Sequence, residues 1–305
     1  MQIIVTGSAK LNIYRKGADS LIGRYIHYHI NPFSHGELRN KMPLGFGDFT
    51  EFLCHPDSST ETSKEVELQN TLLMFGGFPE VFQKQSSSYQ IIWQRQRAEL
   101  MIRQDLRDLS NIISTNQVEI LASMLPEKVG SPLSVQSLVE DLDGSYNSVK
   151  KWLQALEDVY YHFAIKPFSN SIVRSLKKER KFYLYDWTQI EKEGFRFENM
   201  IASHLLKMVH YYNDTGQANL ELKYLRNKSK QEVDFVILNN KKPIATIEAK
   251  LGDVQLSREF EVFHKTFKVP HFQIINKSGY LKKYKTQTSS PAFVIGFGDF
   301  FRLLP

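Results

Sequence analysis

The sequence predicts a multidomain α/β protein. A length of 305 residues exceeds what one small domain usually needs. Hydrophobic residues make up 42% and charged residues 24%, which is typical of a protein that buries substantial cores. Over the C-terminal half, short apolar strands alternate with amphipathic helices, a pattern that favours an α/β domain with a mixed central sheet.

Composition and charge narrow the function classes. No apolar run is long enough to span a bilayer, and the N-terminal residues lack the basic-then-apolar pattern of a signal peptide, so we expect a cytoplasmic protein without a membrane partner. The formal charge of +6 is compatible with nucleic acid as a partner. The single cysteine, Cys54, excludes an internal disulfide and has no partner cysteines for a zinc site.

The first 115 residues divide into two regions. Residues 1–62 open with an expected strand at 2–8 and continue to an alternating segment at 24–30, which also reads as a strand. A polar segment at 55–66 reads as a loop. Residues 63–115 then have helical periodicity with interspersed charges, so we expect a helical linking region there.

Residues 116–170 have the pattern of a winged helix-turn-helix. Two helices, a tight turn, a third helix and a closing strand follow one another. The third helix would face a DNA duplex with Asn147, Lys150, Lys151 and Gln154. Glu157 and Asp158 on the same helix weaken a DNA role and leave domain or protein contacts as the alternative.

The C-terminal domain, residues 178–305, contains a charged hairpin. If its strands pair symmetrically about Lys241, Asp234 lies opposite Glu248, with Val233, Phe235 and Ile237 together on the apolar face. Two ionised carboxylates in that position repel each other. A bound divalent cation or a raised pKa of one acid would relieve the repulsion, and Lys250 could also neutralise charge.

These residues resemble the PD-(D/E)XK motif of restriction-endonuclease-like domains. Glu198 matches the acid of the preceding helix, Asp234 the strand acid, and Glu248-Ala249-Lys250 the (D/E)-x-K triplet. The resemblance implies Mg²⁺ held by Asp234 and Glu248, charge stabilisation by Lys250, support from Glu198, and double-stranded DNA as substrate. The alternatives are surface salt bridges and an inert scaffold that binds DNA or protein.

The front of the chain is similar to the end of a nucleotide-binding domain in a prokaryotic AAA+-type ATPase family. The similarity lies in Thr6-Gly7-Ser8, in L-I-G-R at 21–24, in P-F-S-H-G-E-L at 32–38 and in F-G-G-F-P-E-V-F at 75–82. In that family, a winged helix and a nuclease-like domain of unknown function follow. The resemblance implies that Thr6 or Ser8 senses a γ-phosphate and that Arg24 is an arginine finger.

One element of such an ATPase is absent from the sequence. No segment fits the phosphate-binding loop G-x-x-x-x-G-K-[ST]. We therefore expect residues 1–62 to be a partial module that uses ATP only if the loop is supplied elsewhere, for example by a partner chain.

Overall fold

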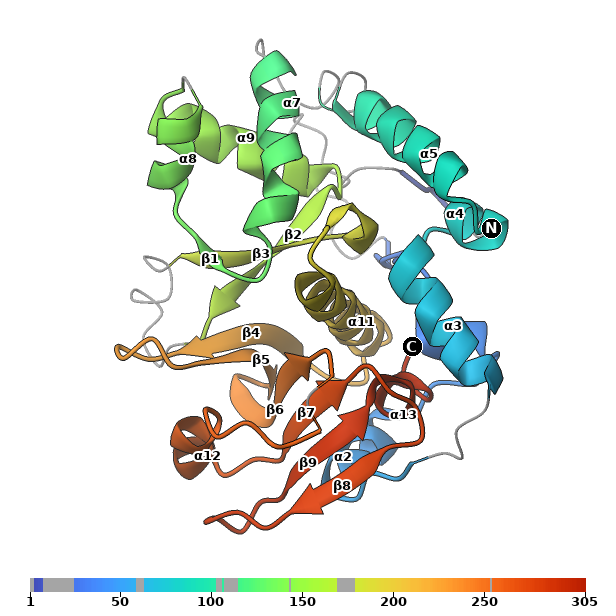
Figure 1. Ribbon diagram of the computed structural model, residues 1–305, viewed down its shortest axis with the longest axis vertical. Coiled ribbons are helices and arrows are strands. Elements are labelled where there is room, and N and C mark those ends of the chain that lie inside the picture. Colours follow the sequence, from blue (N-terminus) through green and yellow to red (C-terminus); the bar gives the residue numbers. More distant parts are fainter. Residues whose placement is uncertain are drawn as a thin grey trace.

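The chain forms a mixed α/β structure around one nine-stranded sheet (Figure 1). The computed structural model describes residues 3–7, 25–58, 63–102, 106, 115–142, 144–168, 179–252 and 254–305. The strands are ordered β1-β3-β2-β4-β5-β6-β7-β9-β8 across the sheet. The described residues form eleven α-helices, none of them long and apolar enough to cross a membrane.

The helices are α1 (His35–Leu38), α2 (Phe46–Cys54), α3 (Ser63–Phe75), α4 (Pro79–Lys84), α5 (Ser87–Leu100), α7 (Thr115–Met124), α8 (Val135–Asp141), α9 (Tyr146–Asp158), α11 (Glu193–Asp214), α12 (Glu261–Phe267) and α13 (Phe297–Phe301). The strands are β1 (Pro132–Leu133), β2 (His162–Pro167), β3 (Arg180–Leu184), β4 (Leu220–Arg226), β5 (Glu232–Asn239), β6 (Lys242–Lys250), β7 (His271–Ile275), β8 (Leu281–Tyr284) and β9 (Ala292–Gly296).

The middle of the chain runs α7, β1, α8, α9, β2, β3. Helix α9 begins after Ser145, whose side chain accepts a hydrogen bond from the Ser148 N–H, and it buries Val149, Leu153 and Leu156 on one face. Strand β3 pairs antiparallel with both β1 and β2. The backbone hydrogen bonds of β3 thus connect it to the strands that precede residue 178, the expected start of the C-terminal domain.

The two halves of the sheet join at a parallel contact between β2 and β4. Lys166 lies opposite Lys223 and Pro167 opposite Tyr224. From there, β4, β5 and β6 form an antiparallel meander, and β7 and β9 continue parallel to β6. Helix α11 contacts both β3 and β4, so it also connects the two halves of the sheet (Figure 1).

The sheet is covered on its two faces by different apolar clusters. Phe235, Ile237 and Ile247 belong to the large core that includes α11. Val236 and Leu238 alternate with them along β5 and pack in a smaller cluster with Phe260 and Phe263. Burial on both faces explains why β5 reads as a nearly continuous apolar run rather than a strict alternation.

The N-terminal region docks on the C-terminal end of the chain. Ser34 and Glu37 form a capping box at the start of α1, so the P-x-S-x-x-E-L motif has a structural role here. Gly36 lies so close to the Leu304 carbonyl that a Cβ atom would be 2.1 Å from its oxygen. Contacts among α1, α3 and α13 complete this junction.

The two strands expected in the first thirty residues are not formed in the parts that the structure describes. Residues 3–7 and 25–30 have no strand assignment, and their apolar side chains are exposed, Ile4 by 90%. The expectation was wrong there because an extended segment becomes a strand only when a neighbour satisfies its backbone groups.

Candidate functional site: a buried lysine among three carboxylates

The hairpin of β5 and β6 has the predicted register beyond Ile237, whereas an irregularity between Ile237 and Leu238 shifts the pairing next to the turn. Phe235 lies opposite Ile247 and Ile237 opposite Ala245, which is symmetric about Lys241. Asn240 and Lys241 have φ values of 48° and 66°, the left-handed conformation of a two-residue hairpin turn. The pairing ends at Phe235 and Ile247, and Asp234 and Glu248 are the next residues along the two strands.

An irregularity between β4 and β5 changes the predicted faces. Val236 lies opposite Lys223 but Val233 lies opposite Leu225, so β5 contains one extra residue between these pairs. Val233 consequently packs with Val236 and Leu238, not with Phe235 and Ile237. The prediction of one shared face for Val233, Phe235 and Ile237 was therefore wrong, because strict alternation does not continue through a bulge.

The centre of the site is Lys181, which comes from β3 and is 0% exposed. Its Nζ atom lies 2.5 Å from Glu232 Oε1, 3.3 Å from Asp234 Oδ1 and 3.4 Å from Glu198 Oε1. We call these four residues the Lys181 cluster. Two residues further along β3, the Tyr183 hydroxyl donates a 2.8 Å hydrogen bond to Glu198 Oε1.

In the Lys181 cluster, one buried ammonium and three acidic side chains offset each other's charge. Burial alone would lower the pKa of Lys181, but the three carboxylates outweigh it, so the pKa lies above its ordinary value. Burial, followed by the charge of Asp234, raises the pKa of Glu198 to about 7, against the opposing effects of Lys181 and Tyr183. Glu198 is therefore a carboxyl group that titrates near neutral pH.

Glu248 and Lys250 form a second pair beside the Lys181 cluster. Glu248 Oε1 lies 2.8 Å from Lys250 Nζ, whereas its buried Oε2 has no hydrogen-bond partner. Burial raises the pKa of Glu248 above its usual range, and the charge of Asp234 adds to this while Lys250 opposes it. Asp234 Oδ2 accepts a 3.0 Å hydrogen bond from the Ala249 N–H, which links the pair to the cluster.

The predicted catalytic residues therefore lie near one another. Their negative charge, however, is neutralised by lysine side chains and not by the expected metal ion. In the described part of the chain, no group of three or more His, Cys, Asp or Glu side chains is arranged to hold a metal. The ammonium of Lys181 lies among Glu198, Glu232 and Asp234, and the ammonium of Lys250 pairs with Glu248. In this arrangement the acids do not fit Mg²⁺, so no chemical step is derived through a metal here.

Sequence reasoning missed Lys181, Glu232 and Tyr183. Lys181 is the last basic residue of the run 174–182, a pattern that by itself indicates a solvated loop or a phosphate-contacting patch. A usable signal was the alternation in "KFYLY", which sets Lys181 and Tyr183 on one face of a strand.

The predicted DNA-facing residues lie on one exposed strip of α9. Asn147, Lys150, Lys151 and Gln154 are all exposed, at the i, i+3, i+4 and i+7 spacing of one helical face. Gln154 Nε2 donates to Asp158 Oδ1 at 3.0 Å.

Of the three predicted nucleotide-sensing residues, the structure describes one. Thr6 is exposed in the segment 3–7, which has no strand assignment, while Ser8 and Arg24 lie outside the described residues. Their roles toward ATP stay predictions.

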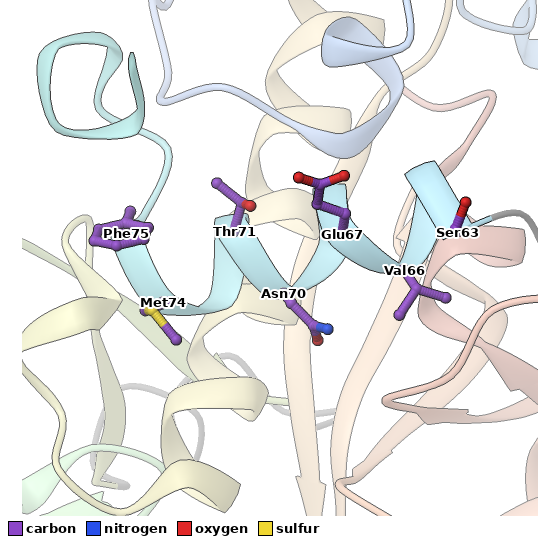
Figure 2. A pocket seen from close by; sticks show the side chains of 7 residues that line it. All are labelled: Ser63, Val66, Glu67, Asn70, Thr71, Met74 and Phe75. Carbon is purple, nitrogen blue, oxygen red and sulfur yellow. The ribbon is translucent and has the colours of Figure 1, made fainter. Parts of the chain in front are cut away.

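A shallow cavity of about 550 Å³ lies on α3. Figure 2 shows that its lining side chains, from Ser63 to Phe75, all come from that one helix and point in different directions. No second element contributes converging polar groups, so this cavity supports no catalytic arrangement.

Comparison with known proteins finds similarity to uncharacterised families. Residues 66–188 match a domain of unknown function, DUF8612, and residues 193–291 match another, DUF4143. The uncharacterized protein MJ1544 of Methanocaldococcus jannaschii is 21% identical over 281 residues, which cover 87% of this chain and 59% of the relative. The chain thus spans well under two thirds of that relative's length.

No solved structure matches the chain significantly. The two matched stretches meet between residues 188 and 193, immediately before α11. Strand β3 and its Lys181 therefore belong to the first matched stretch, whereas the three carboxylates of the Lys181 cluster belong to the second.

Proposed function

We propose that this chain is a non-catalytic nucleic-acid-binding module, made of a winged helix joined to a nuclease-like domain. The observation that carries the proposal is the ammonium of Lys181, fully buried among Glu198, Glu232 and Asp234. In a PD-(D/E)XK nuclease such carboxylates would hold the metal. Here a side chain of the chain itself neutralises them, which favours a scaffold over an active site.

The order of the elements supports the two domain types. The succession α7, β1, α8, α9, β2, β3, with β3 between β1 and β2, suits a winged helix. Helix α11, the meander β4–β6, helix α12 and the parallel strand β7 suit a nuclease-like core. The PD-(D/E)XK resemblance and this topology are consistent with each other.

The exposed strip of α9 supports nucleic acid as the ligand. Lys150 and Lys151 lie beside Asn147 and Gln154 on a face that no described element covers. Lysine contacts to phosphates give an affinity that falls steeply with salt, and the amide side chains can contact base edges. The net charge of +6 also favours binding to the negatively charged nucleic acid.

Binding is tested with a fluorescently labelled DNA duplex titrated at low and moderate salt. We expect binding that weakens steeply with salt and that falls by about tenfold in Lys150→Gln/Lys151→Gln, because two phosphate contacts are lost. The matched control, Lys228→Gln/Lys242→Gln, removes the same charge from other exposed positions and should change affinity less than about twofold. Undetectable or salt-insensitive binding would point instead to protein contacts.

Catalysis is tested separately with plasmid DNA and Mg²⁺ or Mn²⁺. We expect no cleavage by the wild-type chain or by Asp234→Ala. Cleavage by the wild type that is lost in Asp234→Ala would overturn the non-catalytic assignment and support the Mg²⁺-dependent phosphodiesterase expected from the motif.

A further inference from the structure

A second cavity lies on the same side of the sheet as α12, outside the residues discussed above. Its volume is about 600 Å³, within the range of small-molecule sites. Three segments line it: the loop 255–258, helix α12, and β8 with the loop 285–288 that follows it. We refer to it as the α12 cavity.

The α12 cavity is lined by an excess of positive charge. Arg258, Lys265, Lys282 and Lys285 contribute four cations, whereas Glu261 is the one acid among the lining residues. None of these four cations forms an ion pair with a described residue, although Lys282 Nζ lies 4.9 Å from the centre of the Tyr284 ring. Four like charges around one concavity create a positive potential that an anion would relieve.

The walls of the cavity are fixed by contacts that do not use these cations. His264 Nδ1 lies 3.0 Å from Thr288 Oγ1, and the Tyr284 hydroxyl donates to the Val254 carbonyl at 3.2 Å. The Phe260 ring stacks on His271 with 4.1 Å between centroids. Helix α12 and the loop after β8 are thereby held together, so the concavity is formed before any ligand binds.

His264 is a buried polar side chain among the lining residues. His264 is 3% exposed, and its Nε2 atom is buried without a hydrogen-bond partner. A buried polar atom without a partner is costly, and ligand oxygens are one way to satisfy it. This observation is independent of the four cations that line the cavity.

We propose that the α12 cavity binds a small anion that carries phosphate. Several lysines and an arginine approaching from different segments suit a group with many oxygens and more than one negative charge, and the arginine can contact two of those oxygens at once. The proposal does not depend on DNA binding by α9 or on the Lys181 cluster.

The test is calorimetric titration of the intact chain with inorganic pyrophosphate. We expect saturable binding to the wild type and a loss of at least about tenfold in affinity for Arg258→Gln/Lys285→Gln, because two charge-assisted contacts disappear. Both positions are exposed, so this variant should fold normally. The matched control is again Lys228→Gln/Lys242→Gln, which should bind pyrophosphate as the wild type does.

Each outcome decides the proposal. No binding by the wild type, or an equal loss in both double variants, overturns it. A competing titration with a short DNA duplex separates the two sources of phosphate. Displacement of pyrophosphate by the duplex would overturn assignment to a small anion, whereas simultaneous binding of both ligands would support it.

Discussion

Replacing Lys181 with methionine tests the charge balance of the site most directly. The substitution keeps an unbranched side chain of similar length but removes the ammonium that lies within 3.4 Å of three carboxylates. Direct attraction at such distances is about 5–7 kcal/mol per contact at an effective dielectric constant of about 20. The desolvation of the buried ions offsets much of this attraction.

The net loss follows from leaving buried acids without a partner. Removing one member of a buried ion pair usually costs about 3–5 kcal/mol, a large part of a total stability of roughly 5–15 kcal/mol. We expect a loss in that range for Lys181→Met at pH 7. The loss should be smaller at pH 5, because Glu198, whose pKa is raised to about 7, is then protonated and its uncompensated charge disappears.

The assay is urea unfolding followed by circular dichroism at both pH values. Lys223→Met is a matched control, because Lys223 lies on the neighbouring strand β4 and forms a 2.9 Å pair with the more exposed Glu221. Such a pair contributes about 0–1 kcal/mol. If Lys181→Met costs no more than this control and its cost is the same at pH 5 and pH 7, Lys181 does not balance the acids.

Three further predictions concern stability. Gly36→Ala should destabilise the chain by about 1–3 kcal/mol in thermal unfolding, because its Cβ would meet the Leu304 carbonyl; a wild-type melting temperature would refute this. Asn199→Ala should cost about 2–4 kcal/mol in urea, because the Asn199 amide holds both backbone groups of Leu184 at 2.7 Å; a cost under 1 kcal/mol would contradict it. Glu198 keeps its proton in the folded state up to about pH 7, whereas the unfolded chain releases it near pH 4.5, so wild-type stability should fall as pH rises between these values. Glu198→Gln should flatten that profile, and an unchanged slope would refute the assignment.

Local sequence rules predicted the hairpin well. The flanking apolar residues are enough to select the register about Lys241 for Phe235 and Ile237, because burial of one face fixes it. The pairing next to the turn is shifted by an irregularity between Ile237 and Leu238, which the sequence did not predict. The stripe of Val149, Leu153 and Leu156 on α9 was also predictable, because helical periodicity reports it directly.

The charge balance was not predictable in the same way. Lys181 lies more than fifty residues from Asp234, and it reaches the acids only because β3 is brought beside them by the joining of β2 and β4. A bulge shifts Val233 to the other face, and a bulge has no fixed sequence signal. The expected N-terminal strands failed for a related reason, since periodicity identifies a half-buried segment but not the neighbour that completes it.

The seam between β2 and β4 has a mechanical consequence. Two residue pairs make up this seam, which by itself gives little resistance to bending. Further ties between the two halves include the Asn199 amide on α11, the Tyr224 hydroxyl, which donates to the Glu179 carbonyl, and Lys181, whose acids all come from the other side. One buried lysine therefore carries charge contacts across the seam, so its removal would weaken the joint between β3 and the later strands as well as leave the acids uncompensated.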